Sequence, residues 1–134
     1  MAAAVAAAGG DVERTATVLA GIFGAAGVAL GALGAHALAG RLDTRAAALW
    51  ETAARYQLLH AAALLGLAWA ASRWPGPWTA AAIWNVAAGT AVFSGTLYAL
   101  ALGAPRWLGA VTPLGGLAMI AGWLLLGAAV LVGH

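Results

Sequence analysis

The chain has 134 residues, of which 64% are hydrophobic and 7% are charged. A soluble domain carries about 25% charged residues, so this chain is too apolar to be solvated as a globular domain. All six basic residues are arginines that are scattered along the chain, and the net charge of +2 is too small for a nucleic-acid-binding surface. The absence of cysteine excludes disulfides, thiolate metal sites and cysteine nucleophiles. The composition indicates an integral membrane protein.

Residues 1–14 are rich in alanine and glycine and lack a basic segment in front of an apolar core. We interpret them as a flexible N-terminal tail rather than a signal peptide. Residues 15–134 are predicted to form a single transmembrane domain.

Runs without charged residues predict four membrane-spanning helices. A helix needs about 20 residues to cross roughly 30 Å of hydrocarbon, and lipid offers no partner for exposed backbone polar groups. The predicted spans cover approximately residues 15–38, 54–72, 79–102 and 110–132. The predicted fold is an all-α, up-down bundle of four transmembrane helices.

The second span is short, because its charge-free run extends only from Tyr56 to Ser72. Arg55 is therefore expected at the membrane interface, and Glu51 lies one turn earlier, where an ion pair is favourable. This helix is expected to begin in the preceding connection, near Asp43 or Thr44.

The fourth span contains Pro113, which has two interpretations. Pro113 can kink a longer helix by freeing the carbonyl of Gly109. Alternatively, Thr112 is the N-cap and Pro113 the first helical residue. We favour the kinked helix, because residues 108–111 are too apolar for a solvated loop.

Four of the six arginines lie in or beside the first and third connections: Arg41, Arg45, Arg55 and Arg106. Only Arg14 and Arg73 lie on the opposite side. The positive-inside rule therefore places the first and third connections in the cytoplasm and both termini in the periplasm. Aromatic residues are expected at the two interfaces, with Trp74 and Trp78 at one and Trp50, Tyr56, Tyr98 and Trp107 at the other.

The first span carries a stripe of small residues on one face. Its members are Ala20, Gly24, Gly27, Gly31 and Gly34, which fall within about 80° of a helical wheel. Such stripes let helices approach closely in lipid. We predict tight packing of this face against a neighbouring helix or a second copy of the chain. Leucine at Gly27 or Gly31 is expected to hold the helices apart.

Polar side chains gather at one depth of the predicted bundle: His36, Arg55, Tyr56, Gln57, His60, Ser94, Tyr98 and Thr112. In an up-down bundle these positions fall in one leaflet. We expect Arg55, Tyr56, Gln57 and His60 to form one hydrogen-bonded group, because a buried polar atom without a partner costs about 1–3 kcal/mol. Their expected partners are Ser94, Tyr98, Thr112 and the carbonyl of Gly109. His60 should point into the bundle, and Arg55 toward headgroups or Glu51.

Three segments, in order, carry a resemblance to a known family: "GALGAHAL", "WETAARYQLLHAAALL" and "FSGTLYALALGAPRWLGAVTPLGGLAMIAGWLLL". They resemble the YgdD-like family of small inner-membrane proteins, also called domain of unknown function 423, which includes transmembrane protein 256 of animals. The resemblance covers about residues 20–126. It implies four transmembrane helices in the bacterial inner membrane, and it implies no reaction.

We predict a non-enzymatic membrane protein that acts as a structural or accessory subunit of a membrane complex. No aspartate or glutamate lies in a predicted span, which argues against a carboxylate proton relay. The alternative is a lipid- or quinone-binding bundle, because basic groups at headgroup depth can hold anionic lipids. The candidate partners are the lipid bilayer, a membrane protein, a second copy of the chain, a lipid or a quinone.

Two further interpretations rank lower. His36 and His60 lie on neighbouring predicted helices, as the axial ligands of a b-type haem do, but interfacial histidines bonded to Tyr56, Gln57 or carbonyls explain them better. Ser94 and His60 resemble a nucleophile and base, yet no acid is placed to orient the histidine. We therefore predict no cofactor, metal site or catalytic residue.

Overall fold

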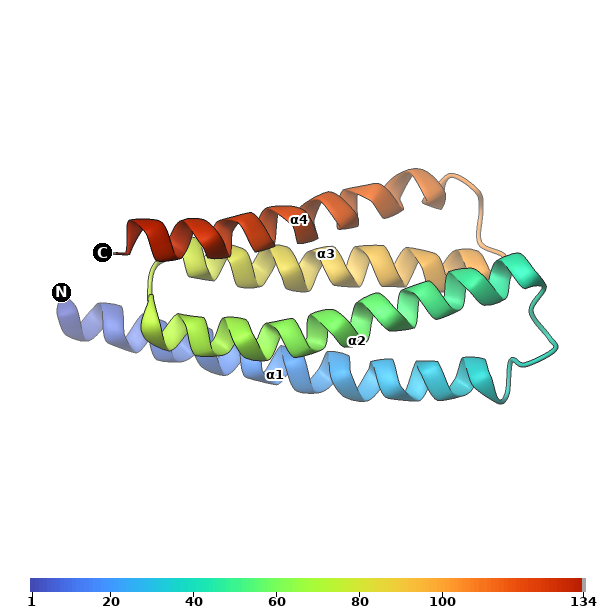
Figure 1. Cartoon of the computed structure of the whole chain (residues 1–134), viewed down its shortest axis with the longest axis horizontal. Coiled ribbons are helices and arrows are strands. Elements are labelled where there is room, and N and C mark those ends of the chain that lie inside the picture. Colours follow the sequence, from blue (N-terminus) through green and yellow to red (C-terminus); the bar gives the residue numbers. More distant parts are fainter. Residues whose placement is uncertain (134) are drawn as a thin grey trace.

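The computed structural model of the protein describes residues 1–133, and these form four long helices. They are α1 (Ala2–Ala35), α2 (Thr44–Arg73), α3 (Pro77–Ala101) and α4 (Leu108–Val132). The helices run up and down beside one another (Figure 1). Both chain ends and the α2–α3 connection lie at one end of the bundle, and the other two connections lie at the opposite end.

Three of the described helices are long and apolar enough to cross a membrane: Gly9–Ala35, α3 and α4. Among residues 1–133, this confirms an all-α fold with helices that are apolar enough to span a membrane. The first span starts earlier than expected and takes in Asp11 and Glu13. Helix α2 is not among the three, and its first half carries Glu51, Arg55 and Gln57.

The structure has helix where the sequence suggested a flexible tail. Helix α1 begins at Ala2, since alanine, the strongest helix former, dominates the first eight residues. Gly9 reaches the α2–α3 connection, where a methyl group added to it would lie 3.2 Å from Cβ of Pro75. The first turns of α1 thus pack beside that connection, while His134 lies outside the described residues.

Residues at the helix ends explain where the helices begin and turn. Helix α2 begins at Thr44, as predicted, and Asp43 caps it by accepting a hydrogen bond of 2.8 Å from the N–H of Ala46. Pro77 is the first residue of α3, a position where its missing N–H costs nothing. Gly40 and Gly103 turn the chain with φ of 74° and 93°, a region that favours glycine.

Helix α4 continues through Pro113 and has Trp107 at its N-cap position. The alternative with Thr112 as the N-cap is therefore wrong. Helix is favoured over residues 108–111 because an apolar loop would leave backbone polar groups without partners in lipid. The hydroxyl of Thr112 instead lies 3.2 Å from the carbonyl of Leu108, one turn earlier in the same helix.

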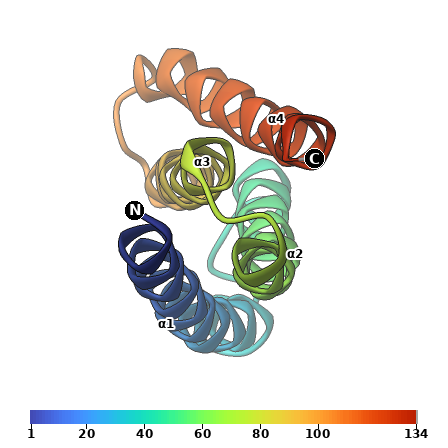
Figure 2. The same ribbon diagram turned by 90° about the vertical axis from the view of Figure 1, so that its left-hand side faces the viewer.

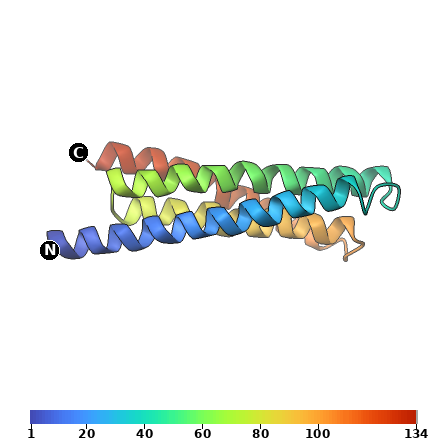
Figure 3. The ribbon, with the colours of Figure 1, turned by 90° about the horizontal axis from the view of Figure 1, so that it is seen from below.

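The helices pack in chain order. Helix α2 packs extensively on α1 and α3, and α3 packs on α4, whereas α1 touches α3 only slightly. The end view (Figure 2) shows α4 on the far side of α3 from α1. Figure 3 shows α1 and α2 side by side along most of their length. Helix α2 therefore occupies an inner position, with neighbours on two sides.

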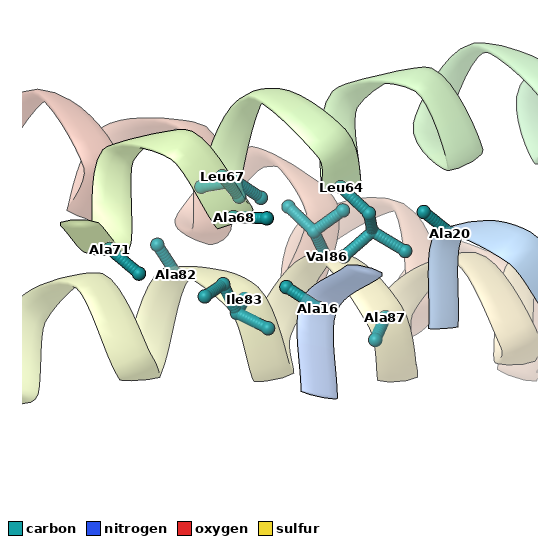
Figure 4. Close-up of a cluster of buried hydrophobic side chains, with 10 residues drawn as sticks. All are labelled: Ala16, Ala20, Leu64, Leu67, Ala68, Ala71, Ala82, Ile83, Val86 and Ala87. Atoms are coloured by element: carbon teal, nitrogen blue, oxygen red, sulfur yellow. The ribbon is translucent and has the colours of Figure 1, made fainter. Parts of the chain in front are cut away.

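A buried apolar cluster joins α1, α2 and α3 in the half of the bundle that holds the termini (Figure 4). Its members are Ala16, Ala20, Leu64, Leu67, Ala68, Ala71, Ala82, Ile83, Val86 and Ala87. Leu125 and Leu126 of α4 pack against it. Six of its ten members are alanines. Small side chains let the helix backbones approach closely, and the resulting dispersion energy stabilises helix packing in lipid, where no hydrophobic force acts between helices.

The backbones of α3 and α4 touch at glycines. A methyl group at Gly115 would lie 2.5 Å from the backbone nitrogen of Phe93 and 2.7 Å from the carbonyl oxygen of Gly89. At Gly122 it would lie 2.6 Å from the side chain of Val86. These contacts were not predicted, because the stripe of small residues that indicated close packing lies on the first span.

Replacing Gly115 by alanine should destabilise the bundle by about 1–3 kcal/mol, because the backbones of α3 and α4 have to move apart. Its neighbour Gly116 is the matched control, since a methyl group there would be in ordinary contact, 3.8 Å from Phe93. G116A should be neutral or stabilising by up to about 1 kcal/mol, as alanine favours helix. Thermal unfolding in detergent measures both, and equal melting temperatures would contradict the prediction.

Candidate functional site

Gln57 is the centre of the polar groups inside the bundle. Its side chain is buried on α2, and its Nε2 donates to the carbonyl of Phe23 on α1 at 3.0 Å. Its Oε1 accepts a hydrogen bond of 2.9 Å from the hydroxyl of Tyr98 on α3. One amide therefore joins three helices, and Tyr98 is the expected partner that reaches this group.

His60 points into the bundle, as the sequence predicted, and is buried one turn from Gln57. Its Nδ1 lies 2.8 Å from the carbonyl of Tyr56, which can only accept, so Nδ1 carries the proton. Its Nε2 accepts a hydrogen bond of 3.2 Å from the indole N–H of Trp123 on α4. The neutral imidazole satisfies both contacts. Trp123 was not among the expected partners.

Within residues 1–133, the side chains of Arg55 and Tyr56 are exposed and form no hydrogen bond with the side chain of Gln57 or His60. Arg55 forms an exposed ion pair of 2.7 Å with Glu51, as expected. The ring of Tyr56 lies parallel to that of His60 and packs on Phe93 at a centroid distance of 4.7 Å. The four residues do not form one hydrogen-bonded group, because Gln57 bonds to Phe23 and Tyr98, His60 bonds to Trp123, and Arg55 pairs with Glu51.

Ser94 and Thr112 hold other helix pairs together. The hydroxyl of Ser94 on α3 donates to the carbonyl of Ala53 on α2 at 2.8 Å. The hydroxyl of Thr112 on α4 lies 2.7 Å from that of Thr96 on α3. Both residues are buried away from water, so their hydroxyl groups obtain their hydrogen-bond partners from the neighbouring helices.

His36 lies apart from the cluster. It is exposed and occupies the position just after α1, where its backbone N–H bonds to the carbonyl of Ala32. Among residues 1–133, no side chain donates to the carbonyl of Gly109, the other expected partner. Both ring nitrogens of His60 are already engaged within the bundle. The arrangement therefore offers no bis-histidine haem site from His36 and His60.

Trp50 is buried, although the sequence placed it at the interface. Its indole N–H donates to the carbonyl of Leu30 on α1 at 2.8 Å. The rings of Trp50 and Tyr98 pack in a T-shaped arrangement, with their centroids 4.6 Å apart. A signal for this role was present, since Trp50 lies seven residues before Gln57 and thus on the same face of α2.

The predicted glycine stripe of α1 faces α2. Its four glycines are Gly24, Gly27, Gly31 and Gly34. A methyl group at Gly27 would lie 2.8 Å from Leu58, and one at Gly34 would lie 2.5 Å from Trp50. At Gly24 and Gly31 the nearest side-chain atoms would be 3.9 and 4.0 Å away, which leaves room for alanine. Glycine itself is required at only two of the four positions.

The space beside the polar cluster is small. A cleft of about 90 Å³ adjoins Gln57 and is lined by Phe23, Thr90 and Ala91. Ligand pockets usually measure about 300–1,000 Å³. Within residues 1–133, every buried side-chain nitrogen and oxygen has a hydrogen-bond partner. The polar atoms of the cluster are therefore satisfied by the protein itself.

The model of the family described as "Protein of unknown function (DUF423)" matches residues 30–116, a segment that includes the whole of α2 and α3. The chain belongs to the DUF423 family. Three relatives carry the name UPF0382 membrane or inner membrane protein. No solved structure matches the chain.

The DUF423 relatives are bacterial membrane proteins of similar length. YgdD of Escherichia coli K12, named an inner membrane protein, is 41% identical over 85% of this chain and 87% of its own length. YwdK of Bacillus subtilis is 39% identical over 74% of this chain and 81% of its own. A protein of Staphylococcus haemolyticus is 42% identical over 74% and 80%. The comparisons confirm the predicted family and a small membrane protein.

A double-mutant cycle tests the bond between Gln57 and Tyr98. We expect Q57L and Y98F each to lower the free energy of unfolding by about 1 kcal/mol, because each leaves a polar partner unsatisfied. The double variant should cost less than the sum, because the second change removes the orphaned group. Unfolding in detergent provides the measurement, and strictly additive losses would show that the two side chains do not interact.

Proposed function

We propose that this DUF423 protein is a non-enzymatic structural or accessory subunit of a membrane complex. The observation that carries the proposal is the internal use of its polar groups. Gln57, His60 and Ser94 each bond to a neighbouring helix, and the cleft beside them is about 90 Å³. These side chains serve to fix the helices, which leaves the outer surface of the bundle as the part available to partners.

Lipid or quinone binding at the cluster is the alternative, and the geometry supports it less. A quinone ring would need a larger cavity and a free donor or acceptor. An enzymatic role is disfavoured on similar grounds, since the hydroxyl of Ser94 is engaged with the carbonyl of Ala53. A bis-histidine haem ranks last, because His36 is exposed and lies outside the cluster.

All four helices cross the membrane in this proposal, including α2. Helix α2 is the least apolar of the four, but Gln57 and His60 are buried within the bundle instead of facing lipid. Its 30 residues correspond to about 45 Å of helix, longer than the hydrocarbon core. Its close packing on α1 and α3, which are both apolar enough to cross, further supports this topology.

Orientation and a kink complete the proposed topology. The arginines beside the first and third connections favour a cytoplasmic location for that end and a periplasmic location for both termini, in the bacterial inner membrane. We propose that helix α4 bends at Pro113, which lies inside the helix, because the proline ring removes one hydrogen bond and crowds the preceding turn.

Cysteine labelling tests the topology, because the natural chain has no cysteine of its own. Single variants A39C and A104C place a thiol in the first and third connections, S72C places one at the end of α2 beside the second connection, and G133C places one near the C-terminus. In spheroplasts, a membrane-impermeable maleimide should label S72C and G133C, and it should label A39C and A104C only after lysis. Equal labelling of A39C and S72C would show that α2 does not cross, and the reversed pattern would overturn the orientation.

Purification from native membranes in mild detergent tests the functional proposal. We expect a protein partner at a fixed ratio to the chain, and we expect H60A to lower stability without changing any bound species. Mass spectrometry of the protein and of its organic extract measures both. The alternative would be correct if one lipid or quinone per chain were present and H60A released it while the fold survived.

A further inference from the structure

A second polar feature lies at the end of the bundle, away from the cluster around Gln57. It is a groove of about 240 Å³ between the start of α2 and the end of α3 with the connection that follows. Arg45 lines it from α2, and Arg106 lines it from the α3–α4 connection. Leu49, Leu100 and Ala101 form an apolar part of its wall.

Among residues 1–133, neither arginine of this groove forms an ion pair. Within residues 1–133 the only ion pair joins Arg55 to Glu51. Asp43 also lines the groove, but its Oδ1 accepts the hydrogen bond that caps α2. The N-terminus of α2 adds a partial positive charge at the same place. The groove is therefore lined by two arginines whose positive charge is not neutralised by an ion pair within residues 1–133.

The position of the groove identifies the kind of anion. Arg106 lies in the connection between α3 and α4, which are both apolar enough to cross the membrane. It therefore lies at the depth of lipid headgroups. The indole of Trp107 beside it is 66% exposed, as expected of an aromatic residue at the interface. The apolar wall suits acyl chains, which a soluble phosphate compound lacks.

We propose that this groove binds one anionic phospholipid, with its phosphate between Arg45 and Arg106 and an acyl chain along Leu49 and Leu100. Guanidinium groups bind phosphate oxygens through paired, charge-assisted hydrogen bonds. The site goes beyond the proposed function: it requires only that the protein lies in a bilayer, and it stands whether or not a protein partner exists.

Lipid retention measured by native mass spectrometry tests the site. The protein is purified in detergent and supplied with either phosphatidylglycerol or phosphatidylcholine. We expect one phosphatidylglycerol to be retained in preference to phosphatidylcholine. R45Q and R106Q should each weaken its binding about fivefold, and the double variant about 25-fold. R55Q, which removes an equal charge outside the groove, is the matched control and should leave retention unchanged.

The variant D43N tests whether removing a negative charge from the groove strengthens the binding of phosphatidylglycerol. Asparagine keeps an N-cap while it removes the negative charge that faces the groove, so binding should become tighter. A gain of this kind distinguishes the site from a general loss of folding in the arginine variants. The proposal is wrong if the double arginine variant retains phosphatidylglycerol as the natural protein does, if both lipids bind equally, or if millimolar inorganic phosphate displaces the lipid.

Discussion

The arrangement of α1, α2 and α3 depends on one type of contact, in which a polar side chain of one helix donates to a backbone carbonyl of a neighbouring helix. Trp50 and Gln57 of α2 donate to α1, and Ser94 of α3 donates to α2. A carbonyl oxygen has two lone pairs, so it accepts such a bond and keeps the one within its own helix. Because lipid provides no hydrophobic force between helices, these bonds and the close packing around them fix α1, α2 and α3 relative to one another.

The contacts between α1 and α2 repeat after seven residues, or two helical turns. The donors are Trp50 and Gln57, the acceptors are the carbonyls of Leu30 and Phe23, and the glycines required beside them are Gly34 and Gly27. Each glycine lies four residues after its acceptor, and so its missing side chain uncovers that carbonyl. Both donors have to meet an uncovered carbonyl at the same time, which fixes the register of the antiparallel pair. The stripe of small residues thus exposes backbone carbonyls to hydrogen-bond donors of α2, in addition to allowing close packing of the two helices.

The sequence was sufficient for the four helices of the described residues, because each contains a long charge-free run, although charges also lie within α1 and α2. It was also sufficient for the inward direction of His60 and the pairing of Arg55 with Glu51, which follow from spacing on one helix. It did not predict that the polar residues at one depth divide among different partners, because that depends on how each helix is rotated. Tryptophan fits an interface as well as an interior, so the spacing of Trp50 from Gln57 indicated a shared face of α2 without deciding that Trp50 is buried, and the bond from Trp123 to His60 had no such signal. Helix in the N-terminal segment was not predicted, because alanine- and glycine-rich composition is shared by flexible tails and by helices, and only the high helix propensity of alanine favours the helix.

The polar residues of α2 have a consequence for how the protein enters the membrane. In the four-span topology proposed above, α2 taken alone would expose the amide of Gln57 and the imidazole of His60 to lipid, which is costly. The amide finds its first partner on α1, the helix that is synthesised before it. The α1–α2 hairpin is the smallest unit that lowers this cost, because it gives the Gln57 Nε2 its partner, while the Gln57 Oε1 and His60 gain theirs only with α3 and α4. Insertion and folding of this chain are therefore coupled, and the order of synthesis matches the order in which the polar groups find their partners.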